Sequence, residues 1–158
     1  MKRFHLHVHV TDLEASIGFY TRLFGAGPSR VEGDYAKWML DDPRVSFAIT
    51  TRGQTPGIDH LGIQADSGDE LAEMKARVRA ADMSLVDEGE TTCCYARSDK
   101  HWITDPQGIA WEQFHTLRDI PIFREAEAPA AETPACCAPD PRRGKPVGIP
   151  VRSTPSCC

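Results

Sequence analysis

The chain has 158 residues, of which 41% are hydrophobic and 26% are charged. This length supports one buried core, or two small modules that share one sheet system. The net charge of -5 and the lack of a basic cluster with interleaved aromatic residues argue against a nucleic-acid partner. Since no apolar run has the length of a secretory or membrane-spanning segment, we expect a cytoplasmic protein with no membrane partner and with free thiols.

The N-terminal segment predicts a strand followed by an amphipathic helix. Residues 5–10 alternate, so that one strand face carries His5, His7 and His9 and the other carries Leu6, Val8 and Val10. Apolar residues then recur at helical spacing, after a cap at Thr11 or Asp12 and before a stop at Gly25: Leu13, Ile17, Tyr20 and Phe24. Two strand-like runs, YAKWML and RVSFAIT, lie on either side of Asp42-Pro43.

The same order of elements returns further along the chain. His60 begins a second alternating run, and the capping box SGDE precedes a helix with apolar positions at Leu71, Met74, Val78 and Ala81. The runs ARSDKHWIT and GIAWEQF follow, on either side of Asp105-Pro106. We therefore predict an α+β fold in which two βαβββ modules, about residues 3–51 and 58–116, form an open sheet with a cleft. The helices cover one face, and the folded domain spans residues 1–118.

Residues 119–158 differ in composition, because eight of the twelve prolines lie between Pro121 and Pro155. We expect a flexible tail that builds no core. Two cysteine pairs fall in it, Cys136-Cys137 and Cys157-Cys158. Their four sulfurs suit soft-metal capture, but the spacing is not that of a common zinc module, and an incidental extension is an equal alternative.

All six cysteines occur as adjacent pairs, and the remaining pair is Cys93-Cys94. A disulfide within such a pair would strain the backbone, since neighbouring Cα atoms lie only about 3.8 Å apart. Two adjacent thiols form a soft chelate for zinc, cadmium, copper(I) or trivalent arsenic. A regular strand would point Cys93 and Cys94 to opposite faces, so joint binding requires a turn, which we expect to be mobile. The alternative is a small apolar pair at a sheet edge.

The repeated modules, each opening with His-Leu, resemble the vicinal oxygen chelate superfamily of glyoxalases, bleomycin-resistance proteins and extradiol dioxygenases. This resemblance implies metal ligands at His5, His60 and Glu112. The matching position of the first module falls near residues 46–48, where the sequence has no carboxylate. Two imidazoles and one carboxylate suit Fe(II), and zinc, manganese, nickel or cobalt also accept such ligands. His7 and His9 would line the cleft or support the ligands, and a solvated strand face is the alternative.

The segment ETTCCYARSDKHWI resembles the cadmium-induced proteins and organoarsenical carbon–arsenic lyases (the ArsI/CadI subfamily). The resemblance implies that Cys93 and Cys94 bind a trivalent organoarsenical beside Fe(II), and that dioxygen is used to cleave the carbon–arsenic bond. A mono-organyl arsenical has two exchangeable ligands, which matches two thiolates. Tyr95 and Lys100 would orient substrate or oxygen, or else are ordinary loop residues.

The sequence thus predicts an Fe(II)- and oxygen-dependent lyase that converts methyl or aromatic trivalent arsenicals to arsenite. One alternative is a cadmium- or zinc-binding resistance protein without catalysis. Another is a glyoxalase-like or thiol-transferring metalloenzyme. Whether the modules pair within one chain or in a homodimer stays open.

Overall fold

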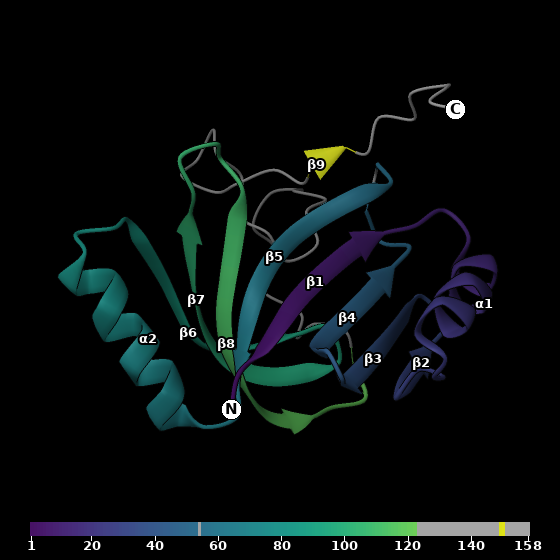
Figure 1. Cartoon of the computed structure of the whole chain (residues 1–158), viewed down its shortest axis with the longest axis horizontal. Coiled ribbons are helices and arrows are strands. Elements are labelled where there is room, and N and C mark those ends of the chain that lie inside the picture. The colour runs from purple at the N-terminus through teal and green to yellow at the C-terminus, as the bar shows by residue number, and fades with distance from the viewer. Residues whose placement is uncertain (54, 123–148, 151–158) are drawn as a thin grey trace.

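The computed structural model describes residues 1–53, 55–122 and 149–150 (Figure 1). The first module consists of β1 (Arg3–His9), α1 (Leu13–Phe24), β2 (Arg30–Glu32), β3 (Tyr35–Asp41) and β4 (Arg44–Thr50). The second consists of β5 (Gly57–Ala65), α2 (Gly68–Ala80), β6 (Leu85–Cys93), β7 (Ala96–Thr104) and β8 (Ala110–Asp119). The predicted α+β fold with two βαβββ modules is confirmed. No helix among the described residues is long and apolar enough to cross a membrane.

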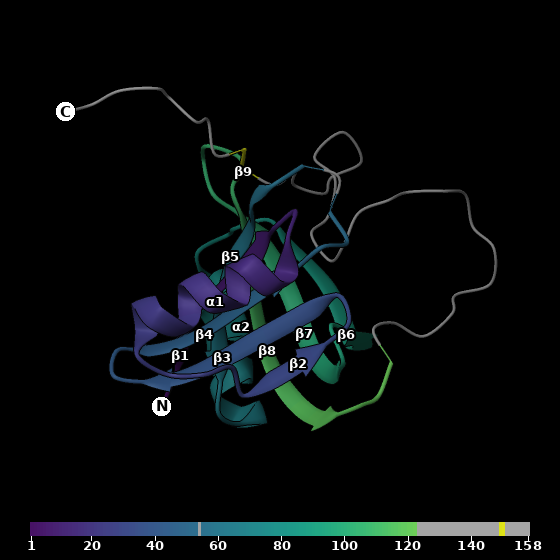
Figure 2. The same ribbon diagram turned by 90° about the vertical axis from the view of Figure 1, so that its right-hand side faces the viewer.

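The strands form one curled sheet in the order β2-β3-β4-β1-β5-β8-β7-β6 (Figures 1 and 2). The opening strands of the two modules, β1 and β5, pair antiparallel at its centre, and each also pairs parallel with the last strand of its own module, β4 or β8. This pseudo-symmetric order places the two His-Leu motifs side by side. A short strand, β9 (Ile149–Pro150), pairs with β5 within the segment for which the sequence predicted only a tail.

Helix α1 begins and ends as its sequence predicts. The Asp12 side chain accepts a hydrogen bond of 2.9 Å from the amide of Ala15, and Gly25 adopts the left-handed conformation with φ 65°. Its apolar stripe packs against the outer face of β1, β3 and β4 (Figure 2), in a cluster centred on buried Trp38, Phe47 and Ile49. Leu6 and Val8 of β1 belong to this cluster, which leaves the histidines of β1 on the opposite, inner face.

Helix α2 begins at the predicted capping box, where the hydroxyl of Ser67 accepts a hydrogen bond of 3.2 Å from the amide of Glu70. Three predicted apolar positions of α2 are buried: Leu71, Met74 and Val78. The prediction for Ala81 is wrong, because the helix ends at Ala80 and Ala81 is an exposed C-cap. Both helices therefore cover the outer face of the sheet, and the inner face remains for the site.

Close packing of β5 against β8 depends on Gly62. A Cβ atom at this position would lie 2.4 Å from the backbone oxygen of Glu112. Gly62 pairs with His5 on one side and with Glu112 on the other. The glycine therefore allows the strand of Glu112 to approach the histidine-bearing strands closely.

Candidate metal and thiol site

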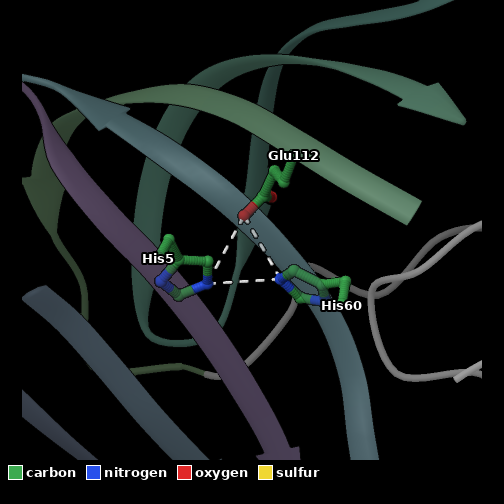
Figure 3. Close-up of side chains that lie close together, drawn as sticks. All are labelled: His5, His60 and Glu112. Atoms are coloured by element: carbon green, nitrogen blue, oxygen red, sulfur yellow. Dashed lines mark hydrogen bonds and ion pairs between the residues drawn. The ribbon is translucent and has the colours of Figure 1, made fainter. Parts of the chain in front are cut away.

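Three side chains from three strands meet at the centre of the inner face (Figure 3): His5 of β1, His60 of β5 and Glu112 of β8. The Nε2 atoms of His5 and His60 lie 3.2 Å apart, and Glu112 Oε2 lies 3.8 Å from the first and 3.4 Å from the second. The three residues are 6%, 1% and 6% exposed. The alternative of a solvated strand face is therefore wrong for His5. His7, at 1% exposure, is also buried.

Both imidazoles are held by a partner behind them. His5 Nδ1 lies 2.9 Å from the carbonyl oxygen of Ser46, and His60 Nδ1 lies 2.7 Å from Oδ2 of Asp59. With Nδ1 donating to its oxygen, each Nε2 faces the centre and offers a lone pair to a metal when it carries no proton. This is the arrangement that a divalent transition metal requires.

Asp59 was not singled out from the sequence, because neighbouring residues of a regular strand point to opposite faces and His60 already points to the inner face. In the structure, His7 pairs with His60 and Val8 pairs with Ile58, so Asp59 is an extra residue in β5. This β-bulge turns the Asp59 carboxylate to the side of His60. A bulge depends on the pairing of distant strands and has no local signature in this segment.

The charge states of the three candidate ligands differ. Burial lowers the pKa of His5 well below its usual value, and neighbouring His60 adds to this effect. Burial alone would raise the pKa of Glu112, but the charge of Lys100 and the hydrogen bond to His60 hold it well below its usual range. Burial likewise opposes charge on His60, but hydrogen bonds to Asp59 and Glu112 outweigh it and raise this pKa to about 9. A cation bound to His60 Nε2 therefore takes the place of a proton.

Lys100 contacts the carboxylate of the candidate ligand Glu112 directly. Its Nζ lies 3.0 Å from Glu112 Oε1, and the residue is only 4% exposed. It belongs to strand β7, so the alternative of an ordinary loop residue is wrong. Because Lys100 occupies Oε1, Oε2 remains directed at the two histidines.

Cys93 and Cys94 lie in a tight turn at the tip of the β6–β7 hairpin, as joint binding requires. Cys94 and Tyr95 have φ values of 57° and 61°, and two central residues with positive φ are typical of a type I′ turn. This conformation costs residues other than glycine about 1–2 kcal/mol each. It brings the two Sγ atoms within 2.9 Å of each other. Cys93 is disulfide-bonded, so the expectation of free thiols is wrong for this residue.

The thiols and the candidate metal ligands share one cavity of about 40 Å³. Its lining includes Cys93, Cys94, the three candidate ligands, and Lys100. Tyr95 does not line it, and its hydroxyl donates a hydrogen bond of 2.5 Å to Asp34. The four other cysteines, Cys136, Cys137, Cys157 and Cys158, fall outside the described residues.

Two further residues line the cavity: Lys37, which was not singled out from the sequence, and His7, for which a place in the cleft was one of the predicted roles. Lys37 of β3 lines the cavity, makes no ion pair with any described residue, and has its pKa lowered by burial. His7 has an Nε2 atom without a hydrogen-bond partner among the described residues. Lys37 pairs with Ala48, and Ala48 pairs with His7, so the three residues share a row on the inner face. This row follows from the register of β3, β4 and β1, and no pattern within one strand predicts it.

Comparisons with known proteins agree with this geometry. Residues 2–113 match the model of the Glyoxalase/Bleomycin resistance protein/Dioxygenase superfamily. The chain belongs to this superfamily. It is 39% identical to a trivalent organoarsenical cleaving enzyme of Bacillus sp. (strain MD1), over 100% of this chain and 99% of that protein. It is 35% identical to the cadmium-induced protein CadI of Mycobacterium bovis, over 87% of this chain and 93% of that protein. The resemblance expected from the sequence is thus confirmed.

Solved structures of the superfamily share the fold at much lower identity. The Mn(II)-bound glyoxalase from Novosphingobium aromaticivorans superposes with a TM-score of 0.53 at 19% identity. The match covers 84% of this chain and 44% of that chain. This likeness concerns the fold alone. The arsenic- and cadmium-related relatives bear on the function.

Proposed function

We propose that the protein is an Fe(II)- and dioxygen-dependent carbon–arsenic lyase that converts trivalent organoarsenicals to arsenite. The observation that supports this proposal is the shared cavity, which Cys93 and Cys94 line together with His5, His60 and Glu112. Two histidines and one carboxylate with open coordination positions are typical of non-haem Fe(II) sites that use oxygen. The names of the organoarsenical cleaving relatives support the same reaction class.

Two thiolates select the substrate by valence. In the reduced chain, a trivalent arsenic atom with one carbon substituent exchanges its two hydroxyl ligands, which leave as water, for the thiol sulfurs of Cys93 and Cys94, and the carbon substituent stays attached. Inorganic arsenite has three exchangeable ligands, so a two-thiol site does not satisfy it. The site therefore binds the substrate more completely than the product, which favours release of arsenite.

The protein residues fix the reacting groups in place. Ser46 and Asp59 orient the imidazoles of His5 and His60, and Lys100 holds one oxygen of Glu112. Bound Fe(II) would supply electrons to dioxygen beside the arsenical. For methylarsonous acid the reaction balances as CH3As(OH)2 + O2 → As(OH)3 + CH2O: the carbon is oxidised, dioxygen is reduced, and arsenic stays trivalent. Formaldehyde is then the carbon product.

The test is anaerobic reconstitution of the reduced full-length chain with Fe(II), followed by methylarsenite or phenylarsenite and oxygen. We expect release of arsenite and, with the methyl substrate, an equal amount of formaldehyde. Cys93→Ser and Cys94→Ser should each abolish release, while Cys136→Ser serves as a matched control. Undiminished arsenite release from the first two variants would exclude the proposed substrate site.

Sequestration of cadmium or zinc without catalysis is the second candidate, favoured by the relative named as a cadmium-induced protein and by the six cysteines. This function requires no oxygen and no Fe(II). It predicts binding of several cadmium ions per chain, no arsenite release, and a loss of capacity when the four cysteines beyond residue 118 are replaced by serine.

A further inference from the structure

The cysteine turn belongs to the second module but is attached to the first. The backbone carbonyl of Tyr95 accepts hydrogen bonds of 2.9 Å from Arg30 Nη1 and 2.9 Å from the amide of Ile120. The guanidinium of Arg30 also lies 5.2 Å from the centroid of the Tyr95 ring. Arg30 comes from β2, at the far edge of the sheet from β6. The curl of the sheet brings these two edges together at the turn.

The side chain of Tyr95 adds a second attachment to the first module. Its hydroxyl donates a hydrogen bond of 2.5 Å to Asp34, and its ring lies 5.5 Å from the ring of Tyr35. Asp34 is in turn paired with Arg52. Tyr95 is 8% exposed, and its hydrogen bond to Asp34 is partly buried. Hydrogen bonds to a carboxylate are stronger than hydrogen bonds between neutral groups.

The turn has a backbone that its sequence does not favour. Positive φ at both central residues favours glycine or asparagine, whereas this chain has Cys94 and Tyr95 there. Strained residues persist where the surrounding structure holds them. Here the contacts from Arg30, Asp34 and Tyr35 hold the turn, and the same turn carries the two thiols at the cavity.

We propose that Tyr95 is a positioning residue: its attachment to Arg30 and Asp34 holds the Cys93–Cys94 turn against the first module, with both sulfurs directed at the metal ligands. This proposal rests on the proposed function, because it assigns the purpose of the attachment to the binding of an arsenical by two thiols. It predicts that arsenical affinity depends on groups that contact neither the arsenical nor the metal.

Two variants separate positioning from simple turn formation. Tyr95→Phe removes only the hydroxyl and keeps the ring, the backbone contacts and the positive φ. Tyr95→Gly provides the residue that a type I′ turn favours but removes the whole attachment through the side chain. If Tyr95 served only to form the turn, glycine would bind arsenicals as well as tyrosine does. If it positions the thiols, glycine should be worse than phenylalanine.

The experiment uses the full chain with Cys136, Cys137, Cys157 and Cys158 replaced by serine, reduced with a phosphine that does not compete as a thiol. The dissociation constant of phenylarsenite is measured by calorimetry, and Fe(II) affinity is measured separately. We expect Tyr95→Phe to weaken phenylarsenite binding about tenfold, the loss of about 1.4 kcal/mol expected for one charge-assisted hydrogen bond. Tyr95→Gly should weaken it further. Fe(II) affinity should not change in either variant.

Tyr20→Phe is the matched control, because Tyr20 lies on α1 in the outer cluster, away from the cavity. Phenylarsenite affinity within twofold of the parent chain for both Tyr95 variants would overturn the positioning role, as would glycine binding better than phenylalanine. A parent chain that binds no phenylarsenite would overturn the positioning role together with the proposed substrate site. Binding without arsenite release would remove only the lyase reaction and leave the positioning role supported.

Discussion

Replacement of Asp59 tests the candidate metal site through the residue that hydrogen-bonds the Nδ1 side of His60. Asp59 is 6% exposed, and its Oδ2 lies 2.7 Å from His60 Nδ1. Burial would raise its pKa, but the hydrogen bond to His60 prevails and lowers it to about 2, so the carboxylate is ionised at neutral pH. Asp59→Ala removes the acceptor that fixes the tautomer and orientation of His60.

We expect this substitution to weaken Fe(II) or Co(II) binding by about 10- to 100-fold, the usual effect of losing such a supporting group. This ratio corresponds to about 1.4–2.7 kcal/mol. Asp59→Asn should have a smaller effect, since the amide oxygen still accepts the hydrogen bond of His60 but carries no full charge. The measurement is anaerobic metal titration followed by calorimetry or by the visible spectrum of Co(II).

The matched control is Asp66→Ala, which removes an exposed carboxylate at the end of the same strand that pairs with Arg44 and the N-terminus. It should leave metal affinity unchanged. An Asp59→Ala variant that binds the metal within twofold of the parent chain would refute the assignment of Asp59 as the group that orients His60.

Three other substitutions probe the cavity and its frame. Lys100→Met should lower Fe(II) affinity and arsenite release, because Glu112 Oε1 loses its buried partner at 3.0 Å. Metal titration is the measurement. Lys75→Met is the control, because its partner Asp87 lies outside the cavity, and it should leave Fe(II) affinity unchanged. Gly62→Ala should destabilise the fold by about 2 kcal/mol or more, since the new methyl group would clash with the backbone oxygen of Glu112. Denaturant unfolding is the measurement. Gly33→Ala is the control, because a Cβ atom at Gly33 would have no atom within 4 Å. Lys37→Met should move the pH profile of Cys94 alkylation to higher pH, because a cation beside a thiol favours the thiolate; an unchanged profile would contradict this.

The sequence was sufficient for the parts of the structure that depend on local patterns. Period-2 alternation from His5 and helical spacing from Leu13 both correspond to elements of the structure, because each reflects one buried face of one element. The proximity of the His5 and His60 side chains followed from the repeat, since equivalent strands of two equivalent modules meet at a pseudo-symmetry axis. Glu112 required the family resemblance, because a lone carboxylate on a strand has no distinctive local signal.

The features of the site that could not be predicted from the sequence depend on contacts between distant strands. Asp59 reaches His60 only through a bulge set by pairing with β1, and Lys37 reaches the cavity only through its register with Ala48. The contact of Tyr95 with Arg30 and Asp34 arises from the curl that brings the two sheet edges together. Tyr95 is separated from Arg30 and from Asp34 by about 60 positions along the chain. No period or motif within one segment encodes such contacts.

The strand register also identifies the residue that distinguishes this site from one with four protein ligands. Glu112 pairs with Gly62, two residues after His60, and Ala48 pairs with His7, two residues after His5. Ala48 is therefore the pseudo-symmetric counterpart of Glu112, and it is 1% exposed in the wall of the cavity. In the proposed site, a small side chain at this position would leave both a coordination position and space beside the cysteines.

Ala48→Glu should therefore supply a fourth ligand and close the substrate space. We expect metal affinity to rise on the order of tenfold, about 1.4 kcal/mol, because a further anionic ligand joins the site. Arsenite release should be lost. Ala48→Gln is the control of equal size: it should also block release but leave metal affinity near that of the parent chain. If glutamate raises metal affinity no more than glutamine does, then Ala48 does not face the metal, and the pseudo-symmetric assignment of the site is wrong.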